Sequence, residues 1–369
     1  LKDVRTFLKN VDSALLEFKY HLTRAHAALT VDEDGAHANE LRKAFAIGRA
    51  RKIYHFDWWL PAIMQRLCAV ALEQDIEAPY VRELIRRNEL LPEANRLIPS
   101  SWPWPVKIYT LGQFRLEVAG KPLTFSGKVQ KKPLEMLKAL VAFGGDEVTE
   151  GQITDALWPD ADGDTARISF KTTLHRLRQL IGHDEAVRVQ EGKVSLDRRY
   201  CWTDVWAFEH ALESSPNRER ADRVGVRDGN AVALVQTKSV IRNPKSQIDK
   251  AVALYKGRFL SGEEDKPWSV SLRERLRNKF LRAIGMLGES WERDGKLKNA
   301  VACNQNGQEV DDLTEEFYHR LMVCYHKLGR KADAIKVYSR CRSVLSASLG
   351  VEPSEETQSA YPALRTGQR

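Results

Sequence analysis

Apolar residues recur at helical spacing along most of the chain, and the pattern changes only near its middle. In the first part it predicts helices over residues 11–29, 38–54, 58–72 and 79–88, and from residue 248 onward it is again typical of consecutive helices. Between residues 106 and 204, short strand-like runs alternate with helical ones. The expected fold class is therefore mostly α, with an α+β segment in the centre.

Prolines and loop-forming residues divide this pattern into regions. Pro92, Pro99, Pro103 and Pro105 exclude a helix over 91–105, which we interpret as a linker. It follows a helical, solenoid-like region at 1–90 and precedes a domain at 106–204. The last domain, 205–369, contains a loop insertion at 213–247 that is poor in apolar periodicity, with Ala231–Val235 as a short strand or helix within it.

The central domain has a specific order of expected elements. Strands are predicted at 106–112, 114–118 and 123–125, followed by a helix at 132–143. The run Thr149-Glu-Gly-Gln152 has the form of a capping box and opens a helix through Trp158. An acidic loop at 160–164, a basic helix at 165–182 and a hairpin at 186–196 complete the order, which is that of a helix-turn-helix with a wing.

The helix at 165–182 has two opposed faces. Phe170, Leu174, Leu177 and Ile181 form one apolar stripe, and Thr165 and Gly182 can cap its two ends. Cationic side chains surround the stripe without an intervening Asp or Glu: Arg167, Lys171, His175, Arg176 and Arg178. Such a helix suits the major groove of a nucleic acid, although by itself it is equally compatible with a solvated basic surface.

A 34-residue repeat marks the C-terminal domain. Leu287, Trp291, Gly295 and Ala300 recur as Leu321, Tyr325, Gly329 and Ala334. This period and residue order predict tetratricopeptide-like helix pairs, in which Gly permits the turn and the aromatic and Ala interlock the helices. The first copy is degenerate, because Asn304 stands where the second has Tyr338.

Composition narrows the classes of function. Net charge is +8, but basic and acidic residues nearly balance in the central domain, so a nucleic-acid role has to rest on local patterning. The five cysteines have no metal-ligand spacing, and no catalytic constellation, cofactor motif or membrane-length apolar run occurs. We therefore expect a non-enzymatic cytoplasmic protein without metal, cofactor or membrane attachment.

Particular residues carry a resemblance to known families. Residues 105–205 resemble the OmpR/PhoB-type winged-helix domain through Leu111-Gly-Gln-Phe-Arg-Leu116, Leu157-Trp-Pro159 and Leu174-His-Arg-Leu-Arg178. The following helices resemble the bacterial transcriptional activation domain through Val205-Trp-Ala-Phe-Glu209, Tyr255-Lys-Gly-Arg-Phe-Leu260, Leu328-Gly-Arg330 and Leu349-Gly-Val-Glu-Pro353. Together they resemble SARP-type activators. The helical region ahead of them resembles large MalT-like regulators, in which a sensor and an ATPase precede the DNA-binding end.

The resemblance and the charge pattern give each candidate residue a role in DNA binding. We expect bases to be read by Ser169, Thr172 and Thr173, which we predict to point outward. We expect Arg176 to contact a base edge or a central phosphate. Phosphate contacts are expected from Arg167, Lys171, His175 and Arg178, and from Trp158, whose alternative is a half-buried core position. The wing residues Arg188, Gln190 and Lys193 are expected near the minor groove.

Two functions remain open at this point. The first is a sequence-specific transcriptional activator that binds double-stranded DNA as a homodimer or higher oligomer and recruits RNA polymerase or partners through its helical-repeat domain. The resemblance implies that the loop 160–164 meets polymerase, and a plain acidic turn is the alternative. The second is a helical-repeat scaffold for protein–protein interaction that does not bind DNA.

Overall fold

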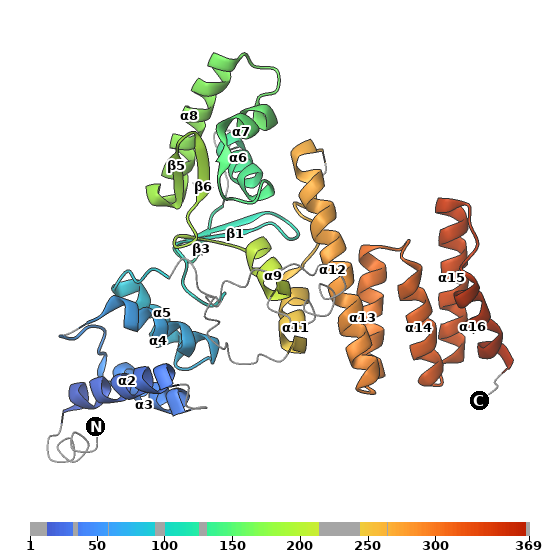
Figure 1. Cartoon of the computed structure of the whole chain (residues 1–369), viewed down its shortest axis with the longest axis horizontal. Coiled ribbons are helices and arrows are strands. Elements are labelled where there is room, and N and C mark those ends of the chain that lie inside the picture. Colours follow the sequence, from blue (N-terminus) through green and yellow to red (C-terminus); the bar gives the residue numbers. More distant parts are fainter. Residues whose placement is uncertain are drawn as a thin grey trace, which may run out of the picture. The chain divides into compact units, whose positions relative to one another are not determined.

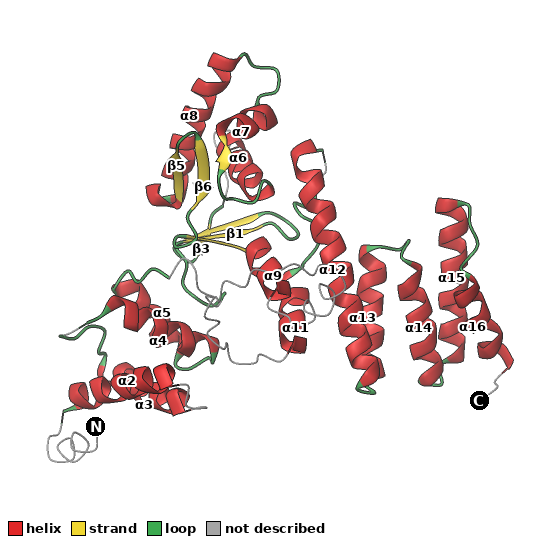
Figure 2. Cartoon of the chain, in the orientation of Figure 1, coloured by secondary structure: helices red, strands yellow, loops and turns green. Residues whose placement is uncertain are grey.

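The computed structural model describes residues 13–31, 36–57, 59–92, 100–124, 131–213, 244–263 and 265–366 (Figures 1 and 2). Contacts divide the chain into two compact units. The first unit comprises Leu1–Ile108, Leu116–Leu140 and Gly145–Trp202, and the second comprises Tyr109–Arg115, Val141–Gly144 and Thr203–Arg369. Most of the predicted insertion, including Ala231–Val235, lies outside the described residues.

The first unit begins with the four predicted helices, α2 (Ala14–Val31), α3 (Ala36–Arg51), α4 (Pro61–Glu73) and α5 (Ala78–Arg87). The predicted start of the third helix at residue 58 was wrong. The helix begins at Pro61, whose fixed φ and missing N–H suit the first helical position. Trp59 precedes this helix and stacks on His55, with ring centroids 5.3 Å apart; Trp58 lies outside the described residues.

A four-stranded sheet with the order β3-β2-β1-β7 lies where the strand-like runs were predicted. Its strands are β1 (Val106–Tyr109), β2 (Arg115–Val118), β3 (Lys121–Pro122) and β7 (Cys201–Thr203). The third strand was predicted at 123–125, but β3 already pairs with β2 through Val118 and Lys121. Ala119 and Gly120 have φ of 51° and 76°, so a tight two-residue turn brings the chain back at once. Phe125 lies outside the described residues.

The remaining elements of the central segment follow in the predicted order. They are α6 (Lys131–Ala142), β4 (Val148–Thr149), α7 (Glu150–Leu157), α8 (Gly163–Ile181), the 3-10 turn η2 (Asp184–Ala186), β5 (Val187–Gln190) and β6 (Lys193–Leu196). The capping box is confirmed, since Gln152 N–H donates to Thr149 Oγ1 and Thr149 N–H donates to Gln152 Oε1. The hairpin β5–β6 is also confirmed, and β4 pairs with its second strand through Val148 and Val194.

The second unit is mainly a row of antiparallel helices (Figure 1). They are α9 (Asp204–Glu213), α11 (Pro244–Leu254), α12 (Pro267–Arg293), α13 (Leu297–Val310), α14 (Glu315–Lys327), α15 (Lys331–Leu349) and α16 (Glu355–Thr366). The predicted insertion extended to residue 247, but α11 starts at Pro244, another residue suited to a first helical position.

The 34-residue repeat corresponds to two helix pairs, α12 with α13 and α14 with α15. Gly295 and Gly329 turn the chain between the helices of each pair, with φ of 71° and 73°. Ala300 and Ala334 are fully buried, in one cluster with Leu321 and Tyr325. The repeat therefore packs as predicted, because small residues let the helices approach and large ones fill the space between them.

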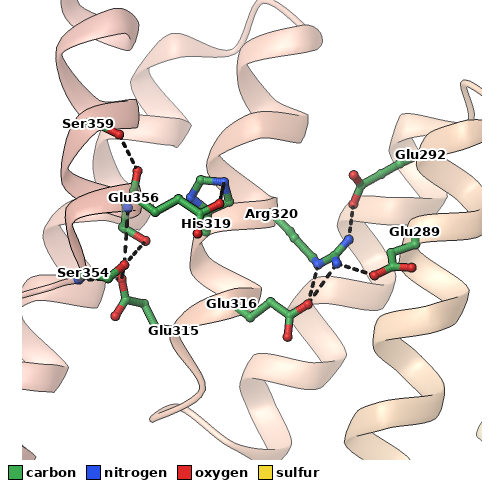
Figure 3. Close-up of polar contacts among 10 residues, drawn as sticks. Glu289, Glu292, Glu315, Glu316, His319, Arg320, Ser354, Glu356 and Ser359 are labelled. Carbon is green, nitrogen blue, oxygen red and sulfur yellow. Dashed lines mark hydrogen bonds and ion pairs between the residues drawn. The ribbon is translucent and has the colours of Figure 1, made fainter. Parts of the chain in front are cut away.

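Two further contacts join neighbouring helices of the repeat. Gly307 on α13 lies against the ring of Phe317 on α14, and a Cβ added there would be 2.5–2.8 Å from three ring carbons. On α14, the guanidinium of Arg320 contacts Glu289 at 2.5 Å, Glu316 at 2.9 Å and Glu292 at 3.7 Å (Figure 3).

The start of α16 is also tied to α14. Ser354 donates from its backbone N–H and its hydroxyl to Glu315 Oε1, at 2.8 and 2.5 Å (Figure 3). Polar contacts therefore hold the last helices together in addition to the apolar cluster.

One buried carboxylate organises the beginning of the second unit. Asp204, at the first position of α9, is 4% exposed and accepts hydrogen bonds from Thr110 N–H, Thr110 Oγ1 and Leu111 N–H at 2.8, 2.9 and 2.8 Å. Burial raises the pKa of Asp204 to about 6, although these three hydrogen bonds favour the charged form.

The segment that Asp204 holds also pairs with residues 258–261. Leu111 bridges Phe259 in antiparallel fashion, Gly112 N–H donates to Arg258 O, and Leu260 N–H donates to Thr110 O. Two backbones approach closely here: a Cβ at Gly257 would be 3.4 Å from the Gly112 Cα, and both glycines have positive φ. Glycine is the residue that allows this approach.

Two substitutions of Asp204 distinguish the contribution of its hydrogen bonds to stability from the contribution of its charge. Asp204→Ala leaves three donors buried without an acceptor and should lower the free energy of unfolding by roughly 3 kcal/mol or more. Asp204→Asn can accept from both backbone N–H groups and donate to Thr110 Oγ1. In the wild type, burial raises the pKa of Asp204 in the folded state. The contribution of the protonated carboxyl group to stability is therefore fully present below about pH 4 and is lost as pH rises through about 6.

We therefore expect the stability of Asp204→Asn relative to the wild type to increase between pH 4 and 7, by roughly 2–3 kcal/mol. Urea unfolding of both proteins at a series of pH values measures this difference. A difference that does not vary with pH would contradict the burial of an ionisable carboxyl at this position.

The contact between Gly307 and Phe317 gives a second prediction. Gly307→Ala forces a methyl group into the ring and should destabilise the protein by about 1–3 kcal/mol. Gly285→Ala is the matched control, since it also lies within a helix but a Cβ there meets nothing within 4 Å. That control should stabilise the protein by about 0.5–1 kcal/mol. Equal effects in chemical denaturation would refute this packing.

Candidate nucleic-acid interface

The basic helix α8 is closed at both ends by its own sequence. Gly182 ends it in the left-handed conformation, with φ of 69°, as expected. The predicted N-terminal cap was wrong: the helix begins at Gly163, and Asp162 is the cap, accepting a hydrogen bond from Thr165 N–H at 2.9 Å. That hydrogen bond lowers the pKa of Asp162. The predicted acidic loop therefore supplies the start of the helix, in which a carboxylate suits the positive end of the dipole.

One face of α8 is buried as the apolar stripe predicted. Phe170, Leu174, Leu177 and Ile181 are at most 7% exposed. Thr173 belongs to the same face, being 7% exposed, so the prediction that it points outward was wrong. Its position three residues after Phe170 places it on the buried side of the helix. Thr173 is therefore not available for reading bases.

The opposite face of α8 is open and cationic. Arg167, Lys171, Thr172, His175 and Arg176 are all exposed, and Ser169 is half-buried. Thr172 donates its hydroxyl to Ile168 O at 2.9 Å, and its oxygen can still accept a hydrogen bond. Within this helix no acidic side chain follows Asp164.

Arg178 has a different position from the other cations. It is half-buried, and its Nε and Nη2 donate to Val187 O of β5 at 3.0 and 2.7 Å. Two charge-assisted hydrogen bonds to one carbonyl join the C-terminal part of α8 to the hairpin. Its predicted phosphate contact stays a prediction, and the structure gives it a role in holding the wing.

The predicted wing residues lie on the hairpin and are exposed. Arg188 on β5 pairs with the buried Asp197, which also binds Arg199 at 2.7 Å. Lys193 on β6 contacts Glu147 at 3.0 Å. Gln190 on β5 is exposed and is the antiparallel pairing partner of Lys193. The hairpin therefore presents polar groups at its tip, and its two cations, Arg188 and Lys193, are both paired within the protein.

Trp158 lies just after α7 and is half-buried. The ammonium of Lys132 is 5.5 Å from the centroid of its ring and donates to Leu157 O at 2.8 Å. This position is compatible both with an indole N–H that reaches a phosphate and with a tryptophan that packs at the edge of the core.

Sequence reasoning missed Ile168, which is 68% exposed on α8. At 3.6 residues per turn, Ile168 lies roughly 170° around the helix axis from the middle of the buried residues. Its exposure could have been predicted, because Ile168 lies outside the apolar stripe that the sequence defines. An isoleucine side chain, however, does not by itself suggest a DNA-binding residue.

Comparison with known protein families identifies a similarity in the C-terminal part of the chain. Residues 231–365 match the bacterial transcriptional activator domain. The C-terminal helical region is therefore similar to this domain over most of its length. The match begins within the segment that the sequence suggested as an insertion.

Relatives with similar sequences carry regulatory names. The regulatory protein AfsR of Streptomyces griseus is 27% identical over 246 residues, which cover 64% of this chain and 22% of AfsR. The regulatory protein DnrI of Streptomyces peucetius is 24% identical over 252 residues, covering 64% of this chain and 84% of DnrI. The chain thus spans about a fifth of the AfsR length, and its resemblance to SARP-type activators is confirmed.

A solved structure shares the fold. The Mycobacterium tuberculosis protein EmbR, in complex with a low-affinity phosphopeptide, aligns with a TM-score of 0.51 and 17% identity over 72% of this chain and 66% of EmbR. The mostly α architecture with a central winged helix is confirmed. Among the described residues, no helix has the length and apolarity to cross a membrane.

The different roles of Arg178 and Arg176 can be measured. Arg178→Ala removes both hydrogen bonds to Val187 O and should lower the free energy of unfolding by about 1–2 kcal/mol. Arg178→Lys should lose part of this, because an ammonium cannot donate in the same planar arrangement. Arg176→Ala, on the exposed face, is the control and should change stability by less than about 0.5 kcal/mol. Equal unfolding midpoints for all three variants would show that Arg178 does not hold the hairpin.

Proposed function

We propose that this chain is a sequence-specific DNA-binding regulator of transcription, most simply an activator. The observation that carries the proposal is the exposed cationic face of α8, opposite a buried stripe and next to the hairpin β5–β6, in a chain with a bacterial transcriptional activator domain. A helix with this division inserts its open face into the major groove while its buried face rests on the protein.

The contacts divide by position along and around α8. In this proposal Ser169 and Thr172, in the N-terminal half of the helix, read base edges, and Arg176 binds a base edge or a central phosphate. Arg167, Lys171 and His175 bind phosphates, together with the remaining N–H groups of Arg178. From outside the helix, Trp158 adds a phosphate contact, and Arg188, Gln190 and Lys193 on the hairpin lie near the minor groove.

The helical repeat supplies the second half of the proposed activity. It contacts RNA polymerase or another protein, and a second copy of the chain on DNA completes a homodimer or higher oligomer. The tightly packed and multiply hydrogen-bonded helix pairs described above support a rigid surface for such contacts. The predicted contact of residues 160–164 with polymerase is part of this proposal, with Asp162 already engaged in capping α8. A sensor and ATPase ahead of these domains likewise remain a proposal.

DNA binding by α8 is tested by two substitutions with different expected signatures. Arg176→Ala should weaken binding to the preferred sequence by ~1–3 kcal/mol if the guanidinium contacts a base edge. Lys171→Ala should weaken binding to all sequences alike and reduce the slope of log K against log salt by about 1. Both are measured by anisotropy titration against a duplex selected from random DNA and against an unrelated duplex.

The two variants also distinguish the proposal from the alternative of a scaffold without DNA binding. If neither the wild type nor the variants bind any duplex preferentially, and their affinity for DNA does not change with salt, the DNA-binding function fails. The half-site spacing of selected duplexes also reports whether two copies bind together.

A further inference from the structure

We infer that Ile168 is a specificity residue that contacts the C5-methyl group of thymine in the major groove, an inference that rests on the proposed DNA-binding function. Its side chain is 68% exposed, more than any other large apolar side chain on the described part of α8. Single exposed apolar residues are common on protein surfaces, so the argument depends on where this one lies.

Ile168 occupies the centre of the open face of α8. Lys171, Thr172 and His175 follow it at three, four and seven positions, so all four side chains project from one side of the helix. Arg167 and Arg176 lie roughly 100° and 80° to its two sides. When Ile168 at the centre of such a face points to the floor of the groove, the longer side chains of Lys171 and His175 reach past it to phosphates. Arg167 then lies toward the phosphates on one side, and Arg176 lies toward a base edge or a phosphate on the other.

The chemistry at the floor of the groove selects one partner for an aliphatic side chain. Among the four bases, only thymine presents a methyl group in the major groove, and the other edges are hydrogen-bond donors and acceptors. Isoleucine can bond to none of these, and burying it against them would desolvate polar groups without compensation. A thymine methyl removes apolar surface from water on both sides of the contact.

The neighbours of Ile168 support an ordered contact. Its carbonyl accepts the hydroxyl of Thr172 at 2.9 Å, which fixes that side chain one turn along the same face. The capping contact of Asp162 with Thr165 N–H, one turn before Ile168, orders the start of the helix. The β-branched isoleucine itself has a strongly preferred rotamer in a helix, so little side-chain freedom is lost on binding.

The experiment combines a change in the protein with a change in the DNA. In the selected duplex, each thymidine is replaced in turn by deoxyuridine, which removes only the C5-methyl group. For the wild-type protein, replacement at one position in each half-site should weaken binding about fourfold, equivalent to ~0.8 kcal/mol for one buried methyl group. For Ile168→Ala, the same replacement should have no effect, while the flanking positions respond as in the wild type.

Val189→Ala provides the matched control, since Val189 is an exposed apolar residue on the hairpin, 37% exposed. This variant should keep the full deoxyuridine effect at the position that depends on Ile168. If the wild type binds a selected duplex but no deoxyuridine weakens it, or if Ile168→Ala keeps the effect, the inference is overturned while DNA binding stands.

Two other results overturn the inference in different ways. If no duplex is selected at all, the proposed function fails and the thymine contact fails with it. If Ile168→Ala lowers self-association in sedimentation experiments without DNA and leaves the deoxyuridine profile unchanged, Ile168 contacts a second copy of the chain instead of a base.

Discussion

The buried carboxylate of Asp204 is the interaction on which the start of the second unit depends. Three donors from Thr110 and Leu111 converge on it, and the segment they belong to pairs in turn with residues 258–261. An aspartate costs free energy when it is taken out of water, and it is retained where several hydrogen bonds compensate that cost. Here these hydrogen bonds fix the path of the chain after β1 and the first turn of α9. Gly112 and Gly257 then allow this segment and residues 258–261 to approach closely.

A second constraint shapes α8, whose open face depends on contacts made elsewhere. Asp162 determines where the helix begins, and Arg178 ties its other end to Val187 of the hairpin. Asp197, buried beside Arg188 and Arg199, orders the hairpin itself. Residues that were expected to bind a ligand thus hold the scaffold, while the centre of the open face is left to Ile168, Thr172 and their cationic neighbours.

Much of this architecture could be predicted because it follows from local rules. The capping box at Thr149 and Gln152, the two-residue turn of the hairpin and the paired glycines of the repeat each depend on residues close together in sequence. Helix phase was equally informative for Phe170 to Ile181, and careful use of the same phase would have placed Thr173 on the buried side. The predicted cap of α8 at Thr165 was wrong, because Asp162, three residues earlier, accepts the hydrogen bond from Thr165 N–H and opens the helix.

Other features depend on parts of the chain that are distant in sequence. Nothing near Arg178 indicates that a carbonyl of the hairpin will lie beside it, and nothing near Leu111 indicates pairing with Phe259. Ile168 shows a different limit: its exposure could be inferred from helix phase, but an aliphatic side chain carries no charge or hydrogen-bonding group that marks it as functional. Its importance emerges only from the polar and cationic side chains arranged around it.

The contact between Asp204 and Thr110 also has a consequence for how the chain is made. These residues are 94 positions apart, so the acceptor leaves the ribosome well after the donors. Until then Thr110 and Leu111 remain solvated, and closing such a long loop has an entropic cost that slows folding. The segment at residues 110–112 thus reaches its final hydrogen bonding only once Asp204 and residues 258–261 have been synthesised. Translation of the chain as far as residue 261 therefore sets the time at which the segment after β1 can form its final contacts.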